Sequence, residues 1–391
     1  MKKSIGIITI FKANNYGAEL QAYATQRTLR DLGYQAELID YLFYKNPAHR
    51  PSRESRPWVR QNLKERLKDW VLYRLAGPLY ECIGSLCSTK MRERLASFKR
   101  FHQQHSHLST TYHSLHDLQA ATLPYDVYIA GSDQIWNPNM GTSLSPYFLD
   151  FAPDTARRIS YASSFGVSEI PASCTDTYRR GLARLDRIAC REAQGVKLVR
   201  QLTGREAVQV LDPTLLLNAS QWRAIGKDQL CPPKGKYILI YNIVELEPIY
   251  RLALRISKET GWPVVKLCKR GMMLEERPGV QNLPEAGPQE FVSLIDQAAL
   301  LLTNSFHGCA FALNLNTPMW VVVDAARSNN SRMESLLALA GQTDRLLDSH
   351  CDVDRLAYNR PMDFTYTNQA LEAERAKSLQ YLTEAIEGDT C

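Results

Sequence analysis

The chain has 391 residues, of which 45% are hydrophobic and 23% charged, as in a globular protein long enough to bury at least one full core. Its net charge of +6 is modest, so it fits an acidic substrate and does not indicate a nucleic-acid partner. The apolar run at residues 4–10 is too short for a signal peptide core, and no run approaches a membrane span. The nine scattered cysteines contain no CxxC pair, which is typical of buried thiols in a reducing compartment. We therefore expect a cytoplasmic protein.

The first elements form one βαβ unit. The pattern predicts a buried strand at residues 5–10, a polar loop at 11–17, a helix at 18–32 and a second strand at 36–41. Gly33 ends the helix. Such a unit indicates a parallel sheet covered by helices on both faces.

Residues 45–120 differ from their surroundings because they are rich in Arg, Lys and His and are interrupted by prolines. We interpret them as helices and loops inserted in the first domain. Segment 60–77 predicts a basic amphipathic helix, either a solvated face or a contact with a membrane or a lipid-linked substrate. The histidines between residues 102 and 116 have no acid or cysteine partner at ligand spacing, so we predict no metal site.

The strand pattern then resumes and repeats in a second series. Further strands are predicted at residues 126–130, 158–163, 188–190 and 207–211. A polar, proline-rich stretch at 212–234 indicates a domain boundary. The second series predicts strands at 237–241, 263–267, 300–303 and 319–323 and helices at 248–260, 288–298 and 307–315.

The pattern predicts an α/β protein with two Rossmann-like doubly wound domains that face each other across a cleft. The N-terminal domain is expected at residues 1–215 and the C-terminal domain at 216–350, followed by a tail with a charged helix at 351–391. Ligands bind such sheets at the carboxyl ends of the strands. Polar residues in the loops after the strands are therefore the candidate site residues.

Ser305-Phe306-His307-Gly308 follows the strand at 300–303. Ser305 is a credible N-cap, which places His307 near the second helical position, where free N–H groups and the helix dipole favour an anion. Gly308 lets a ligand approach the backbone. A histidine there can hold or deliver a proton beside a bound phosphate. The alternative is a histidine that only caps its own loop.

Two loops of the first domain carry polar groups at the corresponding edge. Asn15, Tyr16, Gly17 and Glu19 follow the first strand, and Glu19 could accept a proton from a sugar hydroxyl. The alternative is an asparagine-rich turn whose glutamate complements the helix dipole.

Asp133, Gln134 and Trp136 follow the strand at 126–130 and suit a carbohydrate, with hydrogen bonds for hydroxyls and an indole face for a ring. Alternatively, Trp136 anchors its loop in the core and Asp133 caps a turn.

Three arginines are candidates for binding an anion. Arg191 follows the strand at 188–190 and can fork onto a carboxylate or phosphate. Arg327 and Arg332 flank an Asn/Ser-rich loop after His307 and are second-rank candidates for the same anion. Cys309 points away from His307 on a helix, so a Cys/His nucleophile pair is not expected.

These stretches, in this order, resemble the polysaccharide pyruvyl transferase family. The matching stretches span roughly residues 4–346 and are NNYGAELQA, YDVYIAGSDQIWNP, RISYASSFG, REAQGVKLVRQLTG, VLDPTLLL, LLTNSFHGCAFALN and SNNSRMESLLALAG. The resemblance implies a fold similar to that of GT-B glycosyltransferases. It also implies transfer of the enolpyruvyl group of phosphoenolpyruvate onto two hydroxyls of one sugar, giving a cyclic ketal and phosphate. The acceptor would belong to an exopolysaccharide or capsule, or to its lipid-linked precursor at the inner face of the membrane.

The resemblance assigns roles to residues of this chain. The family's histidine falls on His307 and its arginine before the central linker on Arg191. Some members have an arginine where this chain has Ser305, so Arg327 or Arg332 is expected to supply that phosphate contact. We expect His307, Arg191 and Asp133 to be catalytic, and the donor to contact Ser305, Phe306, Gly308, Arg327 and Arg332. We expect the acceptor on the first domain, at Asn15, Tyr16, Gly17, Glu19, Gln134 and Trp136. Phosphoenolpyruvate is the donor substrate, no metal or other cofactor is required, and the oligomeric state stays open.

Two other functions fit the same pattern. A glycosyltransferase that uses a nucleotide sugar would need a base and ribose pocket in the second domain. A non-catalytic carbohydrate-binding protein would bind sugar without releasing phosphate. The fold alone does not separate these functions, because function resides in the site.

Overall fold

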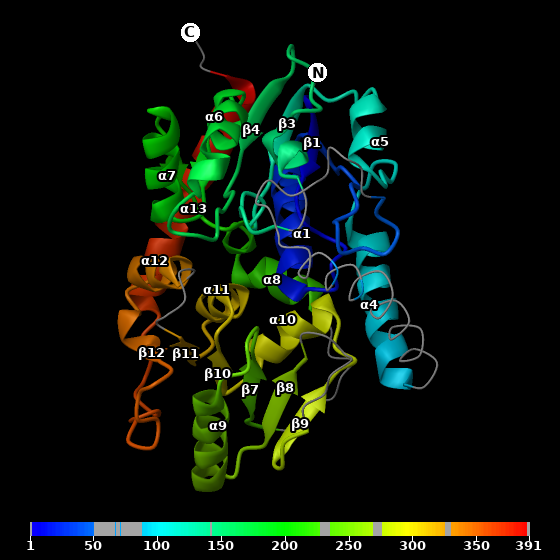
Figure 1. Cartoon of the computed structure of the whole chain (residues 1–391). Coiled ribbons are helices and arrows are strands. Elements are labelled where there is room, and N and C mark those ends of the chain that lie inside the picture. Colours follow the sequence, from blue (N-terminus) through cyan, green and yellow to red (C-terminus); the bar gives the residue numbers. More distant parts are fainter. Residues whose placement is uncertain are drawn as a thin grey trace.

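The computed structural model describes residues 2–50, 67, 71, 88–140, 143–226, 235–268, 276–324 and 330–388. The basic helix expected at 60–77 lies outside the described residues except for residues 67 and 71, and Arg327 lies outside them as well. The chain forms two α/β domains, drawn one above the other in Figure 1. Of the described helices, none combines the length and apolar character needed to cross a bilayer.

The N-terminal domain is built on a parallel sheet. Strands β1 (Ser4–Ile8), β2 (Gln35–Leu38), β3 (Val127–Ala130) and β4 (Arg157–Ser160) lie in the order β2-β1-β3-β4. The short strands β5 (Ala189–Cys190) and β6 (Val208–Gln209) pair with each other. Isolated bridges join Ile159 of β4 to Arg187 and Ser163 to Cys190 of β5. Every residue of β3 is buried, as expected for a parallel sheet covered on both faces.

The C-terminal domain has a six-stranded parallel sheet. Its strands are β7 (Ile238–Tyr241), β8 (Val264–Leu267), β9 (Val280–Leu283), β10 (Leu300–Thr303), β11 (Met319–Val323) and β12 (Leu346–Asp348), in the order β12-β11-β10-β7-β8-β9. The strand order reverses between β7 and β10, so the crevice that binds ligands in such sheets lies at the carboxyl ends of these two strands.

Helices cover both sheets. The α-helices of the N-terminal half are α1 (Tyr16–Asp31), α4 (Thr89–His105), α5 (Leu115–Ala120), α6 (Thr175–Ala183), α7 (Ala193–Thr203) and α8 (Ala219–Ile225). Those of the C-terminal half are α9 (Glu247–Thr260), α10 (Pro288–Asp296), α11 (Phe306–Leu315), α12 (Ser331–Leu339) and α13 (Thr365–Glu387). Short 3-10 helices are η2 (Ser145–Phe148), η3 (Ala172–Cys174), η4 (Pro213–Leu215) and η5 (Thr343–Arg345).

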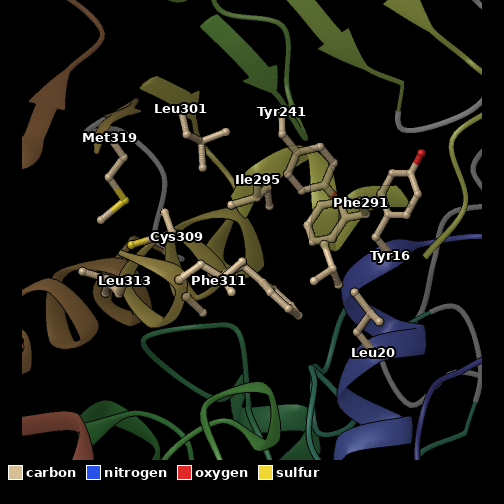
Figure 2. Packing of buried hydrophobic residues seen from close by; sticks show 14 of the residues in the cluster. Tyr16, Leu20, Tyr241, Phe291, Ile295, Leu301, Cys309, Phe311, Leu313 and Met319 are labelled. Carbon is tan, nitrogen blue, oxygen red and sulfur yellow. The ribbon is translucent and has the colours of Figure 1, made fainter. Parts of the chain in front are cut away.

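The two domains share a hydrophobic core. Figure 2 shows Tyr16 and Leu20 of α1 beside Phe291 of α10 and Phe311 of α11. The rings of Tyr16 and Phe291 stack with their centroids 4.8 Å apart. Buried aromatic area of this kind makes a large contribution to an interface. The first helix of the N-terminal domain is thus packed directly against the C-terminal domain.

Helix α13 connects the domains a second time (Figure 1). Near its start, Thr367 Oγ1 donates a hydrogen bond to Ala340 O after α12. Near its end, the Tyr381 hydroxyl donates to Ser160 O of β4. The charged helix expected in the tail is therefore present, and it is a structural element that spans both domains rather than an appendage.

Candidate active site

His307 lies in the first turn of α11, directly after β10. The Ser305 side chain accepts a hydrogen bond from the Gly308 N–H, so Ser305 caps this helix as the sequence predicts. His307 is buried, and its Nε2 lies 3.7 Å from Asp212 Oδ2. Burial lowers the pKa of His307 and outweighs the nearby carboxylates of Asp212 and Asp133, which raise it. The imidazole is therefore neutral at pH 7.

Arg191 follows β5 and has a side chain only 1% exposed. Its Nη1 donates to Asp212 Oδ2 at 2.8 Å. Its guanidinium lies over the ring of Phe306, 4.5 Å from the centroid. Among the described residues, no hydrogen-bond acceptor is in reach of its Nε or Nη2. These two donors form no hydrogen bond with the described residues although carboxylates lie at ion-pair distance, and a guanidinium with such donors can bind a carboxylate or phosphate.

Asp212 joins these two residues, and the sequence interpretation missed it. Its Oδ2 accepts hydrogen bonds from Arg191 and from Ser132 Oγ, and its Oδ1 accepts from the N–H and hydroxyl of Thr214. Burial opposes ionisation, but His307 and Arg191 lower the pKa of Asp212 to about 2. Asp212 is therefore a carboxylate at pH 7. The available signal was its place in Asp-Pro-Thr, directly after the strand segment at 207–211.

Glu192 is a second acidic residue that the sequence interpretation did not select. Its Oε1 accepts hydrogen bonds from Ser164 Oγ and from the Phe165 N–H. Its Oε2 lies 3.9 Å from Arg191 Nε. Asp133 flanks the guanidinium from another side, with Oδ1 3.8 Å from Nη2 and a side chain 21% exposed. The two carboxylates compensate the buried charge of Arg191 without closing a hydrogen bond to it.

Arg332, on α12, brings a second cation to the cluster. The Gln134 amide can be turned so that both its oxygen and its nitrogen have hydrogen-bond partners. In this orientation the Gln134 side-chain oxygen accepts hydrogen bonds from Arg332 Nη2 at 2.8 Å and from Nη1 at 2.9 Å. Burial and, after it, the charge of Arg191 lower the pKa of Arg332 to about 10, so it remains protonated at pH 7. The structure thus places Gln134 against Arg332.

A pocket of about 250 Å³ lies beside the cluster. Arg191, Asp212, Phe306 and Arg332 line it. The other lining residues are Gln209, Val210, Leu211, Leu215, Ser335, Leu336, Leu339 and Glu374. His307 does not line the pocket itself but lies next to Asp212, which does. Arg191, expected to be catalytic, therefore lines one cavity together with Phe306 and Arg332, which were expected to contact the donor.

The prediction that Trp136 presents its ring to a sugar is wrong. Its side chain is fully buried, and its Nε1 donates to Tyr147 O at 2.9 Å. The indole packs against Phe148 and Phe165, with centroids 5.7 Å and 5.2 Å away. Trp136 anchors its loop in the core, which was the alternative interpretation.

Tyr16 and Glu19 also need correction as acceptor-binding residues. Tyr16 is buried in the shared core, and its hydroxyl donates to Ala286 O and accepts from Arg94. Glu19 is buried, accepts from the N–H groups of Lys12 and Ala13, and lies 3.0 Å from His102 Nε2. Both side chains hold the first loop in place and have no open face for a ligand.

Asn15 and Gly17 have structural roles at the start of α1. The Asn15 side chain accepts from the Ala18 N–H and caps the helix. Gly17 lies against the imidazole of His307, and a Cβ atom at this position would overlap the ring. The loop of the first domain therefore meets the histidine of the second domain by direct contact.

Two parallel doubly wound sheets joined by a shared core and a crossing helix define the class of two-domain Rossmann-like proteins that includes GT-B glycosyltransferases. A glycosyltransferase from Streptomyces sp. SF2575, solved with thymidine diphosphate, is similar over 99% of this chain and 100% of its own, with 13% identity and a TM-score of 0.50. The UDP-GlcNAc 2-epimerase from Neisseria meningitidis, solved with UDP-GlcNAc, is similar over 99% and 100% of the two chains, with 10% identity and a TM-score of 0.49. The likeness to the glycosyltransferase shows the fold alone, which confirms the predicted fold class.

The chain belongs to the polysaccharide pyruvyl transferase family, whose sequence model matches residues 15–324. His307, Arg191 and Asp212 lie inside the matched range, and Arg332 and Glu374 lie beyond it. No curated protein matches the chain significantly.

Proposed function

We propose that the protein transfers the enolpyruvyl group of phosphoenolpyruvate to two hydroxyls of one sugar, in a polysaccharide or its lipid-linked precursor. The observation that carries this proposal is the buried Arg191, which lies beside His307 and whose Nε and Nη2 donors form no hydrogen bond with any described residue. Family membership supplies the reaction class, and the site chemistry fits this donor.

The donor carries a phosphate and a carboxylate, and two guanidinium groups are available for them. Arg191 and Arg332 lie 4.5 Å and 6.0 Å from the centre of the same Phe306 ring. An engineered cavity of about 150 Å³ binds benzene, so a pocket of about 250 Å³ has room for a small ligand. That space suits a small dianion or trianion held by two arginines. Asp133 lies 3.8 Å from Nη2 of Arg191, one of the donors that the anion would engage.

His307 is the group that delivers a proton to the donor. It is neutral in the free site, and a bound dianionic phosphate would raise its pKa and favour the imidazolium. The proton goes to the methylene carbon, and an oxocarbenium-like centre develops at the second carbon. One sugar hydroxyl adds to that carbon, the bond to the phosphate oxygen breaks, and the second hydroxyl closes the ring. Of the two protons that the sugar loses, one balances the new methyl group and the other leaves with phosphate.

Incubation with phosphoenolpyruvate and a library of free and lipid-linked saccharides, followed by mass spectrometry, tests the proposal. We expect one saccharide to gain a pyruvyl ketal while phosphate is released. A second test compares the thermal stabilisation by phosphoenolpyruvate with the thermal stabilisation by a panel of nucleotide sugars. It distinguishes the proposed function from that of a glycosyltransferase. Stabilisation only by a nucleotide sugar would overturn the proposal, as would saccharide binding without phosphate release.

A further inference from the structure

The pocket beside Arg191 has a wall that comes from outside the family match. Glu374 of α13 lines the pocket, and the family model ends at residue 324. The Glu374 side chain is 27% exposed and forms an ion pair with Lys377 on the same helix. The carboxylate is therefore accessible to a ligand in the pocket.

Hydrogen bonds on the same helix fix the position of Glu374. Arg375 Nε donates to Leu215 O at 2.9 Å. Three residues further along, Ser378 Oγ accepts from the Leu211 N–H at 3.0 Å. Leu211 and Leu215 also line the pocket. The linker that contains Asp212 and the helix that contains Glu374 are thus bound to each other beside the pocket.

The negative charge of Glu374 gives it a different ligand preference from the two arginines. Asp212, the other carboxylate of the wall, already accepts hydrogen bonds at both oxygens. A carboxylate next to the phosphate or carboxylate of a donor would repel it. Glu374 therefore suits a neutral, hydroxyl-bearing part of a ligand, because a carboxylate accepts hydrogen bonds from hydroxyls. Gln209 and Ser335 line the same pocket with neutral polar groups.

We propose that Glu374, together with Gln209 and Ser335, binds the reacting hydroxyls of the acceptor sugar. The assignment rests on the proposed function, because it places the acceptor in the cavity that Arg191 and Arg332 share. The acceptor site is then formed by the linker, α12 and α13, and not by the loops of the first domain as the sequence suggested. The core positions of Trp136 and Tyr16 agree with this move.

The test compares Glu374→Gln with two matched variants of the same helix. Lys377→Met breaks the same ion pair from the other side and keeps the Glu374 carboxylate. Glu372→Gln removes an exposed carboxylate that pairs with Arg375 and does not line the pocket. Each protein is assayed for phosphate release from phosphoenolpyruvate with a panel of methyl and octyl pyranosides. Stabilisation by phosphoenolpyruvate without acceptor is measured in parallel.

We expect Glu374→Gln to raise the pyranoside concentration for half-maximal rate about tenfold or more, because a hydrogen bond to a charged group is lost. Lys377→Met and Glu372→Gln should leave this concentration unchanged, and all variants should keep the stabilisation by phosphoenolpyruvate. Equal effects of Glu374→Gln and Lys377→Met would show a role confined to the ion pair and overturn the assignment. An unchanged acceptor dependence in Glu374→Gln would overturn it too.

The unmodified protein separates failure of the assignment from failure of the proposed function. If it releases no phosphate with any pyranoside or with any saccharide of the free and lipid-linked library, the proposed function fails before any variant is compared, and the assignment of Glu374 falls with it. If Glu374→Gln does not fold, Ser335→Ala is the second variant, with the same expected effect on the acceptor and the same lack of effect on the donor.

Discussion

Gly17 and His307 touch across the boundary between the domains. Gly17 belongs to the first turn of α1, and a Cβ atom there would overlap the imidazole ring of His307 at the start of α11. On its other side, the ring faces Asp212, with Nε2 3.7 Å from Oδ2. The position of the imidazole is thus set by a residue of each domain and by the linker between them.

The first prediction is that Gly17→Ala lowers turnover about 100-fold, since a displacement of about 1 Å of a catalytic group can have this effect. The new methyl group must push the imidazole away from Asp212 or separate the domains locally. Steady-state rates measure the loss. Gly204→Ala is the control, because a Cβ atom added at Gly204 has no neighbour within 4 Å, so that substitution adds only backbone strain at a φ of +69° far from any steric contact. Equal rates in both variants would contradict the steric role of Gly17.

The second prediction is that His307→Ala lowers turnover about 100- to 10,000-fold, the usual contribution of a general acid or base. Ser305 still caps α11 in this variant, so the variant should fold. Circular dichroism and single-turnover rates check both parts. A folded variant with more than about a tenth of the normal rate would show that His307 does not transfer the proton.

The third prediction is that Arg191→Ala weakens donor binding, in addition to the loss of stability expected when Asp212 loses its buried ion-pair partner. Losing a charge-assisted hydrogen bond costs about 1.5–3 kcal/mol, or about 10- to 150-fold in affinity. Titration of thermal stability with phosphoenolpyruvate measures the change. Arg223→Ala is the control, because Arg223 pairs with Asp296 at the surface and does not line the pocket. Unchanged donor affinity in Arg191→Ala would move the anion site to Arg332.

Local signals in the sequence were sufficient for most of the fold. The run of apolar residues at Leu300–Thr303 predicted β10, and the Ser305 cap predicted the start of α11, because both depend on neighbouring residues only. β9 and β12 were not predicted. Their residues are mostly half-buried, and β9 and β12 lie at the two edges of the sheet, so neither has a continuous apolar run.

The candidate site was less predictable because distant packing decides it. The sequence placed His307 and Arg191 after strands and Arg332 beside an Asn/Ser-rich loop, and these residues do meet. Nothing local showed that Trp136 and Tyr16 would pack inward, since an aromatic residue in a loop serves a core or a ligand equally well. The role of Asp212 depends on partners from three other segments of the chain.

The fourth prediction is that the protein takes up protons when phosphoenolpyruvate binds at pH 7.5. Burial holds the pKa of His307 below its usual value, so the free ring is neutral, and a bound dianion raises that pKa. Calorimetric titrations in two buffers with different ionisation enthalpies measure the uptake. His307→Gln should bind the donor without it. Equal uptake by this variant would place the titrating group elsewhere.

The fifth prediction concerns Asp212→Asn. Removing one partner of a buried ion pair costs about 3–5 kcal/mol, so the variant should be less stable at pH 7 by about this amount. The pKa of Asp212 is about 2 in the folded protein and 3.8 in an unfolded chain. Because the folded-state pKa is lowered, the unfolded state binds more protons, and the contribution of this carboxylate is present above pH 3.8 and lost as the pH falls toward about 2.

The stability gap between Asp212→Asn and the unmodified protein should therefore narrow by about 1 kcal/mol between pH 7 and pH 3, since asparagine does not titrate. Urea unfolding at a series of pH values measures the gap. Asp176→Asn is the control, because Asp176 pairs with Arg179 on the exposed face of α6, where an ion pair contributes little, so its stability gap should be small. A gap for Asp212→Asn that does not change with pH would mean that Arg191 and His307 do not hold the carboxylate in its ionised form.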